Sequence, residues 1–220
     1  MREFESPWID FNLYLITGRA ETLGRPLEFV VEEALRGGVR AVQYRDKDAS
    51  TKELYETAYE LRRLTSRYGA KLIINDRADV ALSVDADGVH IGSASLPLYK
   101  VRRLLGEKKL IGVSCHNQVQ AITAQEMGAD FITFGPVFHT PSKAPFGEPV
   151  GLEKLKGVAE MLQVPVFALG GINKGNCAEA VSCGVRGVAL ISAILSATEP
   201  REAARGILSL MPPLEQGEHG

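Results

Sequence analysis

Amide and cationic side chains follow separate apolar runs of this sequence. Gln43, Arg45 and Lys47 come after one run, Asn75 ends another, and Lys143 stands in a long irregular segment. Hydroxyl donors at comparable places are Ser114, Thr140 and Ser142. Several such donors at one point suit a multiply charged anion such as pyrophosphate. Taken alone, Lys47 is better explained as a solvated loop charge, so this hypothesis depends on the residues meeting at one place.

A second group of residues follows the last two apolar runs. Gly170 and Gly171 end one run, and Ser192 and Ala193 follow the other. Glycine lets a backbone approach an oxyanion closely, and a helix N-terminus offers free N–H groups. The alternative is a tight turn followed by an N-cap serine. We favour a phosphate site.

Three titratable residues stand beside these donors. Asp76 follows an apolar run and is a candidate Mg²⁺ ligand, because Mg²⁺ commonly takes one or two carboxylates together with phosphates and water. It could equally be the N-cap of the following helix. His90 and His116 could act as acid or base, although a hydrogen-bonded structural role is the better explanation. The sequence contains no HExxH motif, and nothing indicates a Ser–His–Asp arrangement.

Eight apolar runs can position these residues, starting near residues 13, 41, 72, 88, 110, 131, 166 and 187. They are continuous rather than alternating, which suits strands buried on both faces of a parallel sheet. Helix-like runs with apolar residues every three or four positions lie at 26–37, 51–69, 96–106, 117–128, 152–163, 175–184 and 201–210, and a short one at 77–84.

Eight strand–helix units predict a single-domain TIM (β/α)8 barrel, in which active residues lie at the carboxyl ends of the strands. A doubly wound open sheet is the alternative. It is less favoured because neither GxGxxG nor GxxxxGK[ST] follows the first run.

The segment FGPVFHTPSKAPFGEPVG, residues 134–151, has no regular period. Loops of this length are uncommon in compact domains unless they bind a ligand or move. We expect its first half to bind anions. Its second half, with Gly147 as a hinge, is a candidate lid that excludes water.

Composition excludes several classes of protein. The chain has 220 residues, a formal net charge of −2 and 45% hydrophobic residues, so it carries no electrostatic footprint for nucleic acid or an anionic membrane. No apolar stretch is long enough to span a membrane, and three cysteines without ligand spacing favour a cytoplasmic protein with buried thiols. We expect an N-terminal extension over 1–11, the barrel over 12–211 and a disordered tail over 212–220. The oligomeric state stays open.

The motifs VQYRDK, INDRADVAL, ADGVHIG, IGVSCH, GADFITFGPVFHTPSK, FALGGI and GVALISAI occur in this order. Together they resemble the thiamine-phosphate synthase family, from about residue 12 to 210. The resemblance implies a TIM barrel that couples a pyrimidine pyrophosphate to a thiazole phosphate with Mg²⁺ as cofactor. Pyrophosphate leaves, and the thiazole nitrogen captures the pyrimidine cation.

The resemblance also implies a role for each matching residue. Arg45, Ser114 and Lys143 would be catalytic, and Asp76 would be a metal ligand. The pyrimidine pyrophosphate would be bound by Gln43, Tyr44, Arg45, Asp46, Lys47, Asn75, Ser114 and Lys143. The thiazole phosphate would be bound by Thr140, Pro141, Ser142, Gly171, Ile191 and Ser192.

The sequence departs from the family pattern in two places. GVHIGSASLP places Ser93 and Ser95 where the family has an amide and the second metal carboxylate, and Gly18 follows Thr17 where an Asp is common. The loss of a carboxylate favours the paralogous thiazole tautomerase, with His116 as acid–base group. Retention of the whole pyrophosphate set favours the synthase. A non-catalytic barrel that binds thiazole phosphate is a third possibility.

Overall fold

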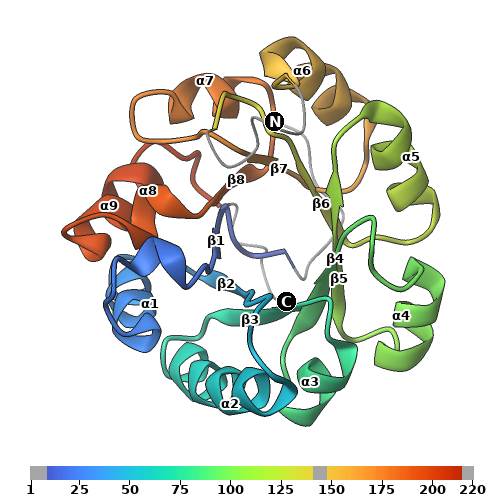
Figure 1. Cartoon of the computed structure of the whole chain (residues 1–220). Coiled ribbons are helices and arrows are strands. Elements are labelled where there is room, and N and C mark those ends of the chain that lie inside the picture. Colours follow the sequence, from blue (N-terminus) through green and yellow to red (C-terminus); the bar gives the residue numbers. More distant parts are fainter. Residues whose placement is uncertain (1–8, 141–147, 215–220) are drawn as a thin grey trace, which may run out of the picture.

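A computed structural model of the chain describes residues 9–140 and 148–214. Eight parallel strands close into one barrel, because β1 pairs with β2 on one side and with β8 on the other. Helices surround the strands on the outside (Figure 1). The predicted single-domain (β/α)8 barrel is therefore confirmed, and the open-sheet alternative is wrong because the sheet closes on itself.

The elements follow the predicted order. The strands are β1 (Leu13–Ile16), β2 (Ala41–Tyr44), β3 (Lys71–Asn75), β4 (Gly88–Ile91), β5 (Leu110–Cys115), β6 (Phe131–Phe134), β7 (Val166–Leu169) and β8 (Gly187–Leu190). The helices are α1 (Leu27–Arg36), α2 (Thr51–Arg67), α3 (Ala78–Ser83), α4 (Leu98–Leu105), α5 (Gln118–Glu126), α6 (Gly151–Met161), α7 (Cys177–Ser182), α8 (Ser192–Leu195) and α9 (Pro200–Leu208). A short 3-10 helix, η1 (Ala20–Thr22), follows β1. Within the described ranges, no helix has the length and apolar character needed to cross a membrane.

A capping box sets where α2 begins. The Ser50 hydroxyl accepts a hydrogen bond from the Glu53 backbone N–H, and the Glu53 carboxylate accepts one from the Ser50 N–H at 2.8 Å. This reciprocal pair satisfies N–H groups that the first helical turn cannot satisfy itself. It also fixes the far end of the short β2–α2 loop, which carries part of the predicted anion site.

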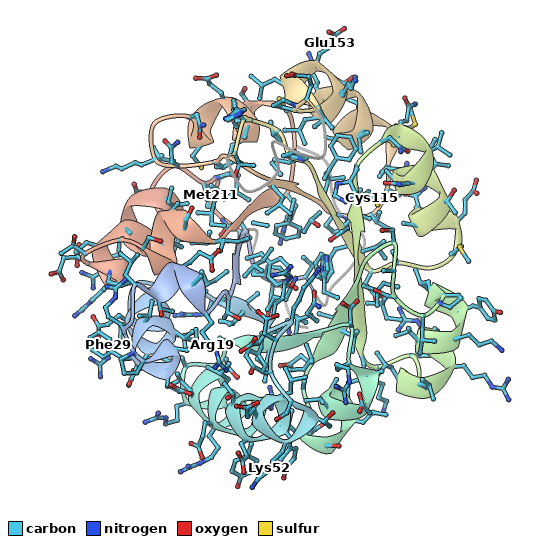
Figure 2. All side chains as sticks on the ribbon, viewed as in Figure 1. Arg19, Phe29, Lys52, Cys115, Glu153 and Met211 are labelled. Carbon is cyan, nitrogen blue, oxygen red and sulfur yellow. The ribbon has the colours of Figure 1, made fainter. Side chains whose placement is uncertain are left out.

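Two hydrophobic cores explain why the strands are apolar on both faces. The larger core lies between the strands and the helices, and the smaller one lies inside the ring of strands. Figure 2 shows side chains in both places, and Phe29, which is 52% exposed, lies on the outer side of α1. Ile9 and Phe11, from the predicted N-terminal extension, pack into the inner core.

Aromatic rings fill much of the barrel interior. Phe11 stacks on Phe167 with ring centroids 5.1 Å apart, and Tyr14 meets Phe131 edge-on at 5.4 Å. The imidazole of His90 lies 5.7 Å from the Phe131 ring. Burial in these surroundings lowers the pKa of His90 to about 3, so the imidazole is neutral at physiological pH.

Ion pairs join helices to strands at the end of the barrel where the strands begin. Asp87 and Asp130 directly precede β4 and β6, and one oxygen of each accepts the backbone N–H of the second residue of the preceding strand, at 2.7 and 2.6 Å. The same oxygens receive Arg62 of α2 and Arg102 of α4, each at 2.6 Å. Each aspartate thus joins one helix, one strand and the next strand through charge-assisted bonds.

We predict that Asp130→Ala lowers the free energy of unfolding by about 2–3 kcal/mol, because it leaves the Ile111 N–H without its acceptor and removes the carboxylate that pairs with the partly buried Arg102. Urea denaturation measures this. The control is Glu60→Ala, whose carboxylate pairs with Arg63 on an exposed helix face at 3.0 Å. Its effect should stay below about 0.5 kcal/mol. Equal losses in the two variants would contradict the prediction.

We also predict that His90 makes the protein less stable in acid. The unfolded imidazole titrates near a pKa of about 6.5, whereas the native one stays neutral down to about 3. Between these values the unfolded chain binds a proton that the native chain does not, so stability is lost as pH falls. By linkage the loss at pH 5 relative to pH 7 is about 2 kcal/mol. Urea unfolding of wild type and His90→Gln should show a shallower pH dependence for the variant; equal slopes would refute this.

Candidate functional site

The alternation of side chains along each strand selects which polar residues face the barrel mouth. Ala41 of β2 and Ile73 of β3 belong to the inner core, so Gln43 and Asn75, two residues further on, point the same way. On β5, Leu110 is in the inner core, and Ser114 shares its parity. Asn75 and Ser114, both partly exposed, therefore lie at the mouth, whereas the Gln43 amide is 2% exposed and lies inside the barrel.

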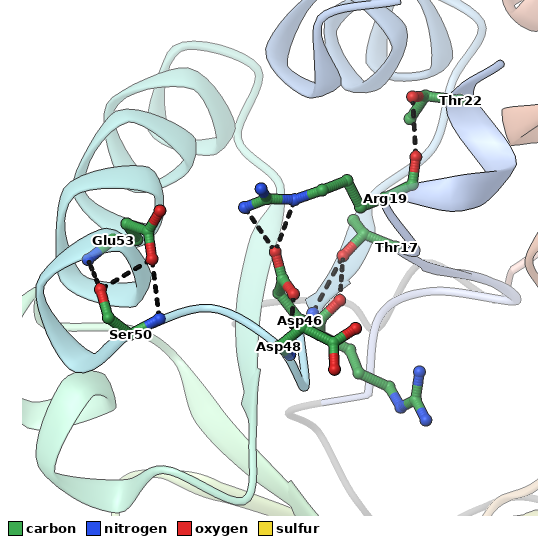
Figure 3. Close-up of polar contacts among 8 residues, drawn as sticks. Thr17, Arg19, Thr22, Asp46, Asp48, Ser50 and Glu53 are labelled. Carbon is green, nitrogen blue, oxygen red and sulfur yellow. Dashed lines mark hydrogen bonds and ion pairs between the residues drawn. The ribbon is translucent and has the colours of Figure 1, made fainter. Parts of the chain in front are cut away.

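Thr17, directly after β1 (Figure 3), holds the backbone of Arg45 in place. The Thr17 hydroxyl accepts the Arg45 N–H at 2.9 Å and donates to the Arg45 carbonyl oxygen at 3.3 Å. In the sequence, Thr17 stands out only as the residue before Gly18, which departs from the family pattern. Its hydroxyl stands in for a strand–strand hydrogen bond at the point where β2 ends.

Arg19 and Asp46 join the same two loops. Nε and Nη2 of Arg19 reach Oδ2 of Asp46 at 2.9 and 2.8 Å, and Oδ1 of Asp46 accepts the Asp48 N–H at 3.2 Å (Figure 3). The Asp46 side chain is only 8% exposed. Both carboxylate oxygens are thus occupied, one by Arg19 of the loop after β1 and one by the backbone of its own loop. The carboxylate therefore stabilises the contact between the two loops. Any contact it makes with an anion has to come from its backbone.

Tyr44 and Lys47 complete the segment predicted to bind pyrophosphate. Tyr44 is 1% exposed and belongs to the core between strands and helices, so its ring points away from the mouth. Lys47 is exposed. Within VQYRDK the structure therefore separates Gln43 and Arg45, which share the inward parity, from Tyr44, whose side chain lies on the other face.

Asp76 lies in a network of donors beside the mouth. Asn75 Nδ2 donates to its Oδ2 at 2.7 Å, and the Ser95 hydroxyl donates to its Oδ1. The Gly92 N–H in turn donates to Ser95 Oγ at 2.7 Å. The N-cap position of α3 is Arg77, with no side-chain capping bond among the described residues, so the N-cap alternative for Asp76 is wrong.

The donor set around Asp76 suits a weakly held Mg²⁺. The carboxylate is exposed and keeps lone pairs beyond those used by its two donors, and the hydroxyl of Ser95 is a neutral oxygen beside it. Among the residues that the structure describes, no group of three His, Cys, Asp or Glu side chains could hold a metal. A site with one carboxylate, completed by water and phosphate oxygens, fits the preferences of this ion.

The base of the 134–151 loop is closed by backbone hydrogen bonds. The Val150 N–H donates to the Pro136 carbonyl at 2.8 Å, and the Gly151 N–H donates to the Val137 carbonyl at 3.2 Å. The segment therefore leaves and returns to the barrel at one place. Thr140 is partly exposed on this loop. Pro141, Ser142 and Lys143, together with the hinge at Gly147, lie outside the described residues.

The same loop packs against the turn after β7. The N–H groups of Val137 and Phe138 donate to the carbonyls of Leu169 and Gly170 at 2.8 and 3.0 Å. Gly171 has φ +68°, and a Cβ there would lie 2.6 Å from the His139 carbonyl oxygen. Glycine is therefore required at this position both for its backbone conformation and for space.

The end of β8 lies beside this turn, because β7 and β8 are paired neighbours. Ile191 occupies the N-cap position of α8, and Ser192 is the first helical residue. The N-cap alternative for Ser192 is therefore wrong, because the cap lies one residue earlier. The predicted thiazole-phosphate residues Gly171, Ile191 and Ser192 follow neighbouring strands, so the barrel brings them to one side of the mouth.

A buried polar network lies directly below the mouth. Gln43 Nε2 donates to the Tyr14 hydroxyl at 3.0 Å, which lies 3.4 Å from His90 Nδ1. His90 Nε2 is 2.9 Å from Ser114 Oγ, and the Thr133 hydroxyl donates to the same Oγ at 3.3 Å. Sequence reasoning did not select Tyr14 or Thr133. Their two-residue spacing from inner-core positions is the only signal that could have found them.

His116 lies at the end of β5 and is held there by a hydrogen bond. His116 Nδ1 donates to the Gly135 carbonyl oxygen at 2.6 Å, which orients the imidazole at the β5 exit.

Cys115, Cys177 and Cys183 are free and buried, and burial raises the pKa of the Cys115 thiol to about 12. The predicted role of the cysteines as small buried residues is confirmed, because such a thiol stays protonated and unreactive.

Comparisons with known proteins agree with this geometry. The family model described as thiamine monophosphate synthase matches residues 13–194. A putative thiamine-phosphate synthase of Geobacter sulfurreducens is 54% identical over 210 residues, which cover 96% of this chain and 99% of the relative. The thiamine-phosphate synthase of Chloroflexus aurantiacus is 44% identical over 203 residues, covering 92% and 94% of the two chains.

A solved structure shows the same fold. The thiamine phosphate pyrophosphorylase from Pyrococcus furiosus superimposes with a TM-score of 0.85 at 38% sequence identity, covering 92% of this chain and 96% of that one. The family match extends from the first strand to α8 and so includes every predicted site residue. The chain therefore belongs to the thiamine monophosphate synthase family.

Proposed function

We propose that this chain couples a pyrimidine carrying a methylene pyrophosphate to a thiazole carrying a phosphate, and so forms thiamine phosphate and releases pyrophosphate. The observation that carries the proposal is the placement of two partly exposed donors, Asn75 and Ser114, at strand ends beside a backbone-anchored Arg45, with the buried Gln43 amide below them. A mouth lined with several donors suits a multiply charged leaving group. A thiazole tautomerase has no need of such a set.

The chemistry requires no nucleophilic side chain. The bond between the methylene carbon and the pyrophosphate oxygen breaks, and its electron pair leaves with pyrophosphate. The lone pair of the thiazole nitrogen then forms the new C–N bond to the pyrimidine cation. In this scheme Arg45, Ser114 and Lys143 donate to the oxygens on which negative charge grows. Preorganised donors of this kind contribute several kcal/mol to transition-state stabilisation.

Arg45 is suited to this part because its backbone is held before any substrate arrives. The double bond with the Thr17 hydroxyl and the Arg19–Asp46 pair fix the β2–α2 loop from the β1 side. The capping box at Ser50 fixes it from the α2 side. With the backbone fixed, only the side-chain torsions of Arg45 lose freedom when its guanidinium binds the departing group.

The thiazole phosphate belongs, in this proposal, on the β7–β8 side of the mouth. Gly171, Ile191 and Ser192 supply backbone and hydroxyl donors there. The first half of the 134–151 loop, with Thr140, Pro141 and Ser142, completes the site. The contacts of the Val137–Phe138 backbone with the β7 turn support this placement, because they join the loop to that side of the barrel.

We further propose that Asp76 binds Mg²⁺ together with the pyrophosphate, with the hydroxyl of Ser95 beside it. When bound, the ion would neutralise charge on the leaving group. The substrates are small molecules, and we place the reaction in the cytoplasm, where three buried free thiols stay reduced.

The decisive experiment is a coupling assay with pyrimidine pyrophosphate and thiazole phosphate, with and without Mg²⁺. We predict that Arg45→Ala and Lys143→Ala each lower turnover by ~10²-fold or more, the scale of losing one preorganised donor. The matched control is Lys52→Ala, an exposed cation of α2, which should leave turnover unchanged. Wild-type turnover in both site variants would remove these residues from the mechanism. A wild type that fails to couple but isomerises a carboxythiazole phosphate would instead support the tautomerase.

Ser95→Asp tests the metal site separately from activity. A second carboxylate beside Asp76 should tighten Mg²⁺ binding by roughly 10-fold, because it adds a charged oxygen ligand. Isothermal titration of Mg²⁺ in the presence of inorganic pyrophosphate measures the effect. The control is Ser93→Asp, which adds the same charge two residues away at an exposed position. Equal affinities in the two variants would contradict the assignment of Ser95.

A further inference from the structure

The polar network inside the barrel restricts where its protons lie. Gln43 Nε2 donates to the Tyr14 oxygen, so the Tyr14 hydrogen is left for its other neighbour, His90 Nδ1 at 3.4 Å. Both rings are buried, and the two nitrogens of His90 face hydroxyl oxygens, so no charged partner supports an imidazolium there. A neutral imidazole carries one N–H, and an Nδ1 that accepts a hydrogen bond leaves that N–H at Nε2.

The direction of these bonds reaches Ser114. His90 Nε2 lies 2.9 Å from Ser114 Oγ, and the Thr133 hydroxyl donates to the same oxygen at 3.3 Å. If Nε2 carries the proton, Ser114 Oγ accepts two hydrogen bonds from inside the barrel. Its own hydrogen is then left to point outward, because Ser114 is the partly exposed member of the network.

We propose that Tyr14 and His90 are positioning residues that fix the Ser114 hydroxyl as a hydrogen-bond donor toward the departing pyrophosphate. This inference rests on the proposed function, in which Ser114 binds that group. A serine that donated inward would turn a lone pair toward the anion and repel it. Fixing the hydroxyl in advance removes the need to reorient it as negative charge develops. No proton is transferred; only the direction of the hydrogen bonds is set.

The packing around His90 holds the imidazole in this orientation. A Cβ at Gly112 would lie 2.5 Å from His90 Nδ1, so glycine makes room for the ring. The rings of Tyr14 and Phe131 lie 5.8 and 5.7 Å from it. A ring confined in this way cannot exchange its two nitrogens by flipping without displacing its neighbours. The geometry therefore supports one fixed arrangement.

The proton position can be measured directly in the full-length protein. The chain has four histidines, so ¹⁵N-histidine spectra at neutral pH give few signals, and His90→Gln identifies those of His90. We expect an unprotonated Nδ1 and a protonated Nε2. The opposite tautomer would overturn the proposal, because Ser114 would then have to donate to Nε2. This measurement needs neither substrate nor turnover.

A double-mutant cycle tests whether Tyr14 acts through Ser114. We expect Tyr14→Phe to lower kcat of the coupling reaction ~10-fold with a smaller change in KM, as for loss of a group that orients a ligand-binding residue. The loss should disappear in the Ser114→Ala background, since there is no hydroxyl left to orient. The control is Tyr68→Phe, which removes a hydroxyl bonded to Glu32 and remote from the mouth.

The outcomes separate the two proposals. An equal loss from Tyr14→Phe in the presence and absence of the Ser114 hydroxyl would show a general structural role and overturn the inference. Absence of coupling in the wild type would refute the proposed function, while the tautomer of His90 would still decide the direction of the network. Rescue also discriminates. His90→Gln, whose amide N–H can replace Nε2–H, should retain more activity than His90→Asn, whose shorter side chain cannot reach Ser114; equal loss in both would count against the proposal.

Discussion

The enclosure of polar groups inside a closed barrel is the constraint on which the site depends. Every second side chain of each strand faces the axis, and Phe11, Phe131 and Phe167 fill much of that space. A hydroxyl or imidazole placed there must find its partners among the other strands, because an unpaired buried polar group is costly. Tyr14 and His90 meet this requirement together, and in doing so they carry an ordered set of hydrogen bonds up to the mouth.

The fold could be predicted because each strand is apolar on both faces and each is followed by a helix-like run. The site was predictable only in part. Asn75 and Ser114 were found because they are polar residues at the ends of apolar runs, which the sequence shows directly. Tyr14 and Thr133 sit within continuous apolar runs, where nothing marks the face that points inward. That face is decided by closure of the barrel, which joins β1 to β8.

The segment after β2 shows, for single residues, the same limit on what the sequence can predict about the site. Sequence similarity assigns Tyr44, Arg45 and Asp46 alike to pyrophosphate binding, because the motif runs through all three. The backbone alternation sends Tyr44 to the helix side, and Asp46 is taken by Arg19 from the neighbouring loop. Arg19 itself could not be predicted, since its role depends on a loop-to-loop contact between residues 27 positions apart.

In the proposed metal site, Ser95 stands where the family pattern has a second carboxylate, and this would change the balance of charge at the mouth. With Asp76 as its one carboxylate, the site would oppose the pyrophosphate with less negative charge than two carboxylates supply. Such a site would also offer Mg²⁺ fewer charged oxygen ligands. Neutralisation of the leaving group then depends more on donors that belong to the chain itself. Such donors are effective only when held in place before the reaction. In the proposed mechanism, Arg45 would meet that condition through its anchored backbone and Ser114 through the hydrogen bonds of the barrel interior.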